Sequence, residues 1–313
     1  MAQNSLIGAT DVVETTLPSG PRASGAVSAR PRGRRRRSWA WLGLVPFFAF
    51  LFIFLLLPTL GVADKALTTS SGGRSFKPLA DAFSEERDAF LSSVRLSLIS
   101  AASGSVLGAL LAYAAATARR PKWLRTLVTA FSGVAANMGG VVLAFAFLTL
   151  IGRAGVATKI FESAGYHLYG SDFRLSSVAG LTIVYLYFQI PLMLLVTLPA
   201  IDGLQPSWRE ASSNLGGTPW TYWRRVGLPV LAPSLLGGFL LLFANAFSAF
   251  ATAYALGTGD ANLVPIKISF FLLGDNLGIS AKPYALATWM IVFMVVSMAG
   301  YLLLRRRSER WTR

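Results

Sequence analysis

Six stretches of the sequence contain no charged residue, and each is about 20 residues or longer, enough to cross the roughly 30 Å hydrocarbon core of a bilayer as a helix. Only 14% of the residues are charged, against about 25% in an ordinary soluble domain. The sequence therefore predicts an all-α polytopic membrane protein with six transmembrane helices. They are expected at Trp41–Leu60, Leu96–Ala118, Leu127–Gly152, Leu175–Ile201, Ala232–Gly257 and Pro283–Leu304.

The positions of the basic residues predict the orientation of these helices. The net charge is +15, and 19 of the 29 Lys and Arg residues lie on the side that would hold both termini. Lys and Arg accumulate in cytoplasmic loops, so both termini are expected in the cytoplasm. The orientation of the helices accounts for the positive net charge, so no nucleic-acid partner is expected. Binding of a polyanionic partner is the alternative explanation of the charge.

The chain divides by composition into a tail, one preceding helix and a core. Residues 1–38 are rich in Ser, Pro, Gly, Ala and Arg, so we expect a disordered cytoplasmic tail that meets anionic membrane lipid. A cleaved signal peptide is the alternative, but no small-residue cleavage site follows. The remaining expected segments are a first transmembrane helix at 39–62, an extracytoplasmic loop at 63–89, a five-helix core at 90–306 and a cytoplasmic tail at 307–313.

The predicted helices lack the groups on which gradient-driven transporters depend. None of the six contains Asp, Glu, Lys or His, whereas a coupling proton or sodium ion needs a titratable or anionic partner at membrane depth. The sequence has no phosphate-binding loop, no cysteine, and one histidine, His167, in a predicted external loop. We therefore expect no catalytic site and no metal site, and the energy for any transport would come from another chain.

Uncharged polar residues inside the predicted helices form a candidate solute path. Asn245, Ser248 and Thr252 follow one another at i, i+3 and i+7, which places them on one helix face. Hydrogen bonding between helices is the alternative role for such residues. Further candidates in the third and fourth helices are Asn137, Tyr187 and Gln189.

The stretch Glu210–Pro229, EASSNLGGTPWTYWRRVGLP, lies between the fourth and fifth predicted helices. Ser207 is followed three residues later by Glu210, which is the spacing of a capping box. This spacing predicts a short helix over Trp208–Leu215.

A glycine corner and a second short helix are expected to follow. Gly216 and Gly217 readily adopt the positive φ values that end a helix. Thr218 and Pro219 have the residue types of an N-cap and a first helical position. The stretch therefore predicts two short helices joined by a corner, on the cytoplasmic side.

The stretch also resembles the hallmark of the permease subunits of binding-protein-dependent ABC importers of type I. The hallmark reads E-A-A, three residues, G, nine residues, then I-x-L-P; here Ser212 replaces the second Ala and Val226 replaces Ile. The resemblance covers about Phe90 to Arg306. The matching residues are Glu210, Ala211, Ser212, Gly216, Val226, Leu228 and Pro229.

The resemblance implies that residues 202–229, called the EAA loop below, carry a cytoplasmic coupling helix between helices 4 and 5 that docks on a separate ATPase. Glu210 would meet a basic residue of that ATPase, Ala211 and Ser212 would allow close approach, and Gly216 would permit the corner. Glu210 as a helix cap is the alternative. The expected ATPase-coupling residues are Glu210, Ala211, Ser212, Gly216, Gly217, Arg224, Leu228 and Pro229.

The resemblance further implies the partners and the solute class. An ATPase dimer would bind ATP and Mg, so this chain would hold no cofactor and would not be an enzyme. A second, distinct permease and an external solute-binding protein would complete the importer in the bacterial cytoplasmic (inner) membrane. A polyamine or a similar small organic solute is expected; the alternatives are a sugar or phosphonate importer permease or a secondary transporter.

Overall fold

The computed structural model describes residues 44–309, except 70–72, 118–121, 168, 170–172, 258–260 and 275–279. The predicted tail at 1–38 and the last four residues, 310–313, lie outside the described residues. The described part is helical, and its β-pairing is limited to an isolated bridge between Thr68 and Arg74. The predicted all-α class is confirmed.

The chain forms two compact units, Met1–Leu51 and Phe52–Arg313. In the first unit, the described residues form α1 (Val45–Leu51), which has no buried residue. The elements of the second unit are η2 (Phe52–Leu56), α2 (Leu57–Ala66), α3 (Lys77–Glu85), α4 (Arg87–Thr117), α5 (Lys122–Ala135), α6 (Val141–Ile151), α7 (Val156–Ser163), α8 (Val178–Asp202), α9 (Pro206–Asn214), α10 (Pro219–Tyr222), η3 (Trp223–Gly227), α11 (Leu228–Ser248), α12 (Ala251–Gly257), α13 (Val264–Leu273) and α14 (Lys282–Glu309).

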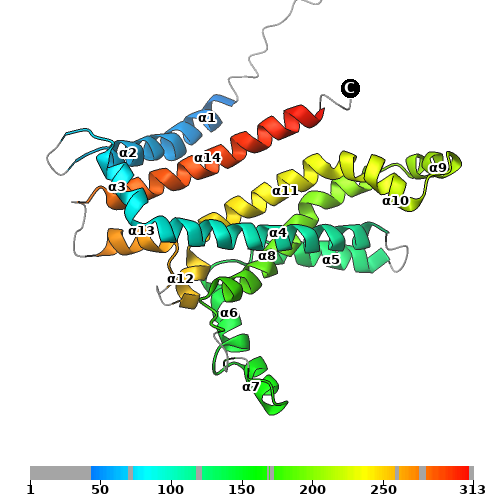
Figure 1. The fold of residues 1–313 in the computed structure, drawn as a ribbon, viewed down its shortest axis with the longest axis horizontal. Coiled ribbons are helices and arrows are strands. Elements are labelled where there is room, and N and C mark those ends of the chain that lie inside the picture. Colours follow the sequence, from blue (N-terminus) through cyan, green and yellow to red (C-terminus); the bar gives the residue numbers. More distant parts are fainter. Residues whose placement is uncertain are drawn as a thin grey trace, which may run out of the picture. The chain divides into compact units, whose positions relative to one another are not determined.

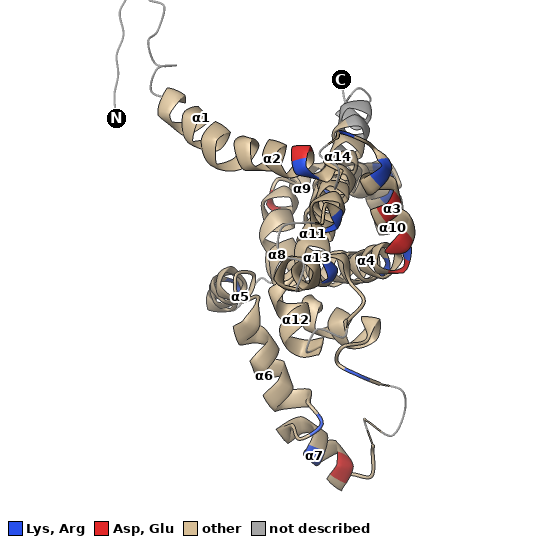
Figure 2. Cartoon of the chain, turned by 90° about the vertical axis from the view of Figure 1, so that its left-hand side faces the viewer, with Lys and Arg blue, Asp and Glu red and all other residues tan. Residues whose placement is uncertain are grey.

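Six helical stretches of the described chain are long and apolar enough to cross a membrane, which confirms the predicted number. Most of the helical ribbon carries neither acidic nor basic residues (Figure 2). The six stretches are Val45–Ala66, Arg87–Thr117, Val141–Ser163, Val178–Asp202, Pro219–Ser248 and Lys282–Gly300.

Two of the predicted helices are broken in the structure. The expectation of one helix over Leu127–Gly152 is wrong, because α5 ends at Ala135 and α6 begins at Val141. The connection ends at Gly140, whose φ of 82° is accessible to glycine without steric cost. Helices α6 and α7 then extend away from α4, α8 and α11 (Figures 1 and 2).

The expectation of one helix over Ala232–Gly257 is also wrong. Helix α11 ends at Ser248, and Ala249 has an extended backbone with a ψ of 93° before α12 begins. The carbonyl of Ala249 leaves the helical ladder and accepts a hydrogen bond from the Tyr185 hydroxyl of α8 at 2.9 Å. The break is therefore compensated by a residue distant in sequence.

Glycines allow α4 to pack closely on α8. A Cβ atom on Gly104 would lie 2.9 Å from the Cβ of Gln189, and one on Gly108 would lie 2.5 Å from the Cβ of Met193. Small residues at such contacts let helix backbones approach in lipid, where packing rather than the hydrophobic effect drives association.

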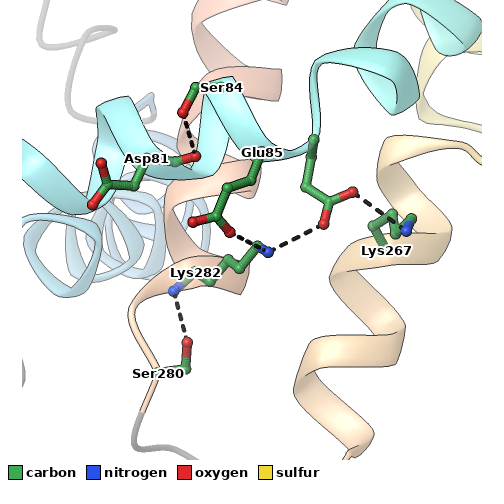
Figure 3. A network of polar contacts seen from close by, with 7 residues as sticks. Asp81, Ser84, Glu85, Lys267, Ser280 and Lys282 are labelled. Atoms are coloured by element: carbon green, nitrogen blue, oxygen red, sulfur yellow. Dashed lines mark hydrogen bonds and ion pairs between the residues drawn. The ribbon is translucent and has the colours of Figure 1, made fainter.

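A cluster of charged residues joins three helices at the end of the second unit opposite α9 (Figures 1 and 3). Lys282, the first residue of α14, contacts Glu85 at 2.7 Å and Glu86 at 3.1 Å, and Lys267 of α13 contacts Glu86 at 3.3 Å. These ion pairs join α13 and α14 to α3 and to Glu86, the residue between α3 and α4. Helix α13 is an additional apolar helix in a region expected to be a loop.

Candidate coupling loop and polar pocket

The first helix of the EAA loop begins one residue before the predicted capping box. Helix α9 starts at Pro206, its N-cap is Gln205, and no side chain caps it. Proline suits the first helical position because its φ is already helical and it has no N–H to satisfy. Ser207 is consequently inside the helix, where its hydroxyl lies 3.5 Å from Gln205 Oε1. The predicted capping box is wrong, and Glu210 has no capping role in the structure.

The predicted glycine corner is present and has the hydrogen bonds of a Schellman motif, but of its two glycines only Gly216 has the expected positive φ. Gly216 has a φ of 75°; its N–H donates to Ser213 O at 2.9 Å, and Gly217 N–H donates to Ser212 O at 2.8 Å. A Cβ atom on Gly217 would lie 2.7 Å from Ser212 O. Ser212 is the third residue of the E-A-A hallmark, and its carbonyl thus accepts the hydrogen bond that stabilises the corner.

The second short helix connects the corner rigidly to α11. Thr218 Oγ1 accepts from the Thr221 N–H at 3.3 Å, which confirms the predicted N-cap. The π-helical segment η3 follows, and the ring of its Trp223 packs edge-on against Tyr113 of α4 at 5.3 Å. A Cβ on Gly227 would lie 2.6 Å from that Trp223 ring. The EAA loop is thereby packed against α4 and continuous with α11.

The outer surface of α9 and of the corner is exposed and unpartnered. Glu210 is exposed and, within the described part of the chain, has no hydrogen-bond or ion-pair partner. Leu215 is 89% exposed and Trp220 is 70% exposed. Of the other predicted coupling residues, Ala211, Arg224, Leu228 and Pro229 are exposed and Ser212 is half-buried.

A groove of about 500 Å³ lies between α9 and the start of α11. It is mostly apolar, with Arg225 at its edge contributing a cation. Sequence reasoning missed Leu215 and Arg225; an apolar residue directly before the Gly-Gly corner was the available signal. The groove is lined by Trp208, Ala211, Ser212, Leu215, Gly217, Thr221, Arg225, Val226 and Val230.

Four of the six predicted path residues meet in one pocket of about 480 Å³, called the polar pocket below. The expected shared helix face does not exist, because Thr252 lies beyond the break that ends α11. The two breaks instead bring the residues together. The pocket is lined by Ala136, Asn137, Gly139, Gly140, Phe188, Asn245, Ser248, Ala249, Phe250, Ala251 and Thr252.

Thr252 joins the two helix breaks directly. Its hydroxyl accepts from Gly140 N–H at 2.8 Å and donates to Gly140 O at 3.3 Å. The pocket therefore presents amide, hydroxyl and backbone groups without any charged side chain among the lining residues. Such a lining forms hydrogen bonds with a polar solute and supplies no counter-ion.

The two other predicted path residues lie outside the polar pocket. Tyr187 packs edge-on against Phe147 of α6 at 6.0 Å. Gln189 is fully buried between α8 and α4, where its Nε2 donates to Ser100 Oγ at 3.3 Å. Gln189 thus takes part in the contact between these two helices.

Residues 104–311 match the family model described as "Binding-protein-dependent transport system inner membrane component". Among curated relatives, the thiamine transport system permease protein ThiP of Salmonella typhimurium is 25% identical over 169 residues, or 54% of this chain and 30% of ThiP. The molybdenum transport system permease protein ModB of Mycobacterium tuberculosis is 28% identical over 182 residues, or 55% of this chain and 65% of ModB. The matched region therefore spans less than two thirds of either relative.

A solved structure has a similar fold. The bacterial alginate ABC transporter in complex with an alginate pentasaccharide-bound periplasmic protein contains a chain that matches with a TM-score of 0.63 and 20% identity. The match covers 88% of this chain and 95% of that one. The chain described here therefore belongs to the binding-protein-dependent transport system inner membrane components, the permease subunits of type I ABC importers.

Proposed function

We propose that this chain forms part of the solute path of an ABC importer and couples that path to a separate ATPase through the EAA loop. The observation that carries the proposal is the exposed surface of α9, where Glu210 is unpartnered and Leu215 is 89% exposed. A large apolar side chain beside a free carboxylate fits a protein-binding surface. Trp223 packs this loop against α4, so docking there would act on the helical bundle.

The energy for transport would come from the ATPase. The polar pocket has no charged side chain, so it offers no site for a coupling proton. ATP and Mg would bind to the ATPase dimer; its closure and reopening would move α9 and so alternate the side on which the polar pocket is open.

The assembly would be completed by a distinct second permease and an external solute-binding protein. The related alginate transporter was solved with a periplasmic binding protein, which supports this partner. The EAA loop and both termini would face the cytoplasm of a bacterial inner membrane, as the excess of basic residues on that side favours.

The solute would be a polyamine or a similar small organic molecule. The polar pocket supplies no counter-ion for such a cation, so selection would rest on the external binding protein. Relatives with similar sequences are named for thiamine, molybdenum and sulfate transport, and a structural relative is named for alginate. These solutes should therefore be tested beside a polyamine.

The test is ATP hydrolysis by the complete complex in lipid nanodiscs with its binding protein. Each member of a panel containing spermidine, thiamine, sulfate, molybdate, phosphonate and alginate oligosaccharide is added in turn. Stimulation by spermidine together with the binding protein is the expected result. Stimulation by another member reassigns the solute, and hydrolysis that ignores the binding protein contradicts the proposal.

A further inference from the structure

We propose that α5 and the connection after it, residues 122–140, carry movement of the EAA loop to the polar pocket, with Arg125 and Thr252 as positioning residues that hold the two ends of this segment. The inference rests on the proposed function, because it concerns how ATPase-driven movement reaches the solute path. It follows from two contacts, one near the start of α5 and one at Gly140 beyond its end, that join this segment to two different functional regions.

The first contact fastens α5 to the base of the EAA loop. Arg125 Nη2 lies 2.5 Å from Oδ2 of Asp202, the last residue of α8. A negative charge at a helix C-terminus is disfavoured by the helix dipole, and the guanidinium offsets it. Only residues 203–205 separate Asp202 from α9, so a displacement of α9 pulls on this ion pair.

The second contact fastens the connection that follows α5 to the polar pocket. After α5 ends at Ala135, the chain turns through residues 136–140 to Gly140. Thr252, which is only 2% exposed, holds Gly140 through its N–H and through its carbonyl. Because Asn137, Gly139 and Gly140 line the pocket, a shift of α5 changes the shape of the pocket wall.

The helix between the two contacts is suited to transmission. Its 14 residues span about 21 Å at 1.5 Å per residue. Val128 packs against the hydrophobic cluster that contains Leu198 and Ile201 of α8. This contact holds α5 against the side of α8. Among described residues 123–140, the Arg125 and Gly140 contacts are the only side-chain hydrogen bonds or ion pairs to another element.

Breaking the ion pair should leave the fold intact. Both side chains are 40% exposed, and ion pairs at such exposed sites contribute little to stability. The Arg125 contact can therefore be removed to examine transmission separately from folding.

The experiment measures solute transported per ATP hydrolysed by the reconstituted importer, for Arg125→Gln, Thr252→Val and the double variant. Each single change is expected to lower this ratio by about 2- to 30-fold, the range of effects within coupling networks. Because the two contacts act in series on one segment, the double variant should lose no more than the worse single variant.

Four control variants separate transmission from structure. Arg125→Asp combined with Asp202→Arg, and separately Thr252→Ser, should restore the ratio, because each rebuilds its contact. Thr129→Val should leave the ratio unchanged, because the Thr129 hydroxyl bonds only to carbonyls within α5. Asp202→Asn is a second way to break the ion pair and should match Arg125→Gln.

Other results would overturn the inference. Losses that multiply in the double variant would mean that the two contacts act independently. Transport and hydrolysis falling together, with an unchanged ratio, would mean that the contacts are structural only. A wild-type complex whose hydrolysis does not respond to its binding protein would contradict the proposed function, and this inference with it.

Discussion

Glu210 is exposed on α9 without a partner in the described chain, and so its charge is available to a docking protein. We predict that Glu210→Lys abolishes uptake while the amount of the permease in the membrane stays at the wild-type level. The physical reason is that the substitution breaks no contact within the subunit and places a cation where a basic ATPase residue is expected. Uptake assays with immunoblots of isolated membranes provide the measurement.

The control is Ser207→Ala, which should change neither abundance nor uptake, because Ser207 caps no helix end in the structure. A compensating acidic substitution in the ATPase should partly restore uptake to Glu210→Lys. Loss of the Glu210→Lys permease from the membrane would instead assign Glu210 a role in holding α9.

The glycine corner predicts a difference between two neighbouring substitutions. At Gly217, a Cβ would lie 2.7 Å from the carbonyl of Ser212 that closes the Schellman motif. Gly216 has a φ of 75° but open space around it, and asparagine tolerates that backbone. Gly217→Ala should therefore impair binding-protein-stimulated ATP hydrolysis more than Gly216→Asn does. Equal hydrolysis by the two variants would contradict the structural role of this corner.

The corner and the Thr218 cap were predictable because each depends on a few neighbouring residues. The capping box failed for an equally local reason. Pro206 competes with Ser207 for the start of α9, and it takes the first helical position. Because α9 begins at Pro206, Glu210 does not cap the helix and its carboxylate has no partner in the described chain. The S-x-x-E spacing alone does not predict this.

The breaks between α5 and α6 and between α11 and α12 cannot be predicted from apolar runs. The runs contain no charge across either break, so hydropathy alone predicts continuous helices. The breaks are stabilised by partners distant in sequence: Tyr185 bonds to Ala249, and Thr252 bonds to Gly140. Sequence reasoning found four of the residues in the polar pocket but assigned three of them to one helix face, which these long-range contacts exclude.

The polar pocket predicts a functional effect of Asn245→Leu combined with Thr252→Val. Loss of an amide and a hydroxyl should alter solute preference, or uptake per permease molecule in the membrane, because a polar lining becomes apolar. Uptake of the transported solute and of its competitors provides the measurement.

Thr149→Val is the matched control, since the Thr149 hydroxyl bonds only within α6. Its uptake should equal that of the wild type. Unchanged transport by the pocket variant would remove these residues from the solute path.

The contact between α4 and α8 predicts a stability effect of Gly108→Ala. The added methyl would lie 2.5 Å from Met193 Cβ and 2.7 Å from the carbonyl of Ile190. Overpacking of this kind costs about 1–3 kcal/mol. We expect a lower thermal unfolding midpoint in detergent and less permease in the membrane.

Gly133→Ala on α5 is the control, because no atom lies within 4 Å of the added methyl. Alanine is the better helix former, so this variant should be at least as stable as the wild type. A Gly108→Ala permease as stable as the wild type would show that α4 and α8 can separate without loss.

At the scale of the whole molecule, composition predicts the number of spans and their orientation but does not predict the solute. The number of spans follows from uncharged length, and the predicted orientation follows from basic residues in the loops, because both depend on composition alone. The solute does not follow, because the polar pocket is uncharged and relatives with similar sequences are named for different solutes.

Solute uptake into proteoliposomes tests most directly whether this permease is driven by a separate ATPase. The permease pair is reconstituted with or without the ATPase, with ATP enclosed on the ATPase side and binding protein outside. Solute should accumulate only when the ATPase, ATP and binding protein are all present. Accumulation that persists in vesicles lacking the ATPase would contradict the account.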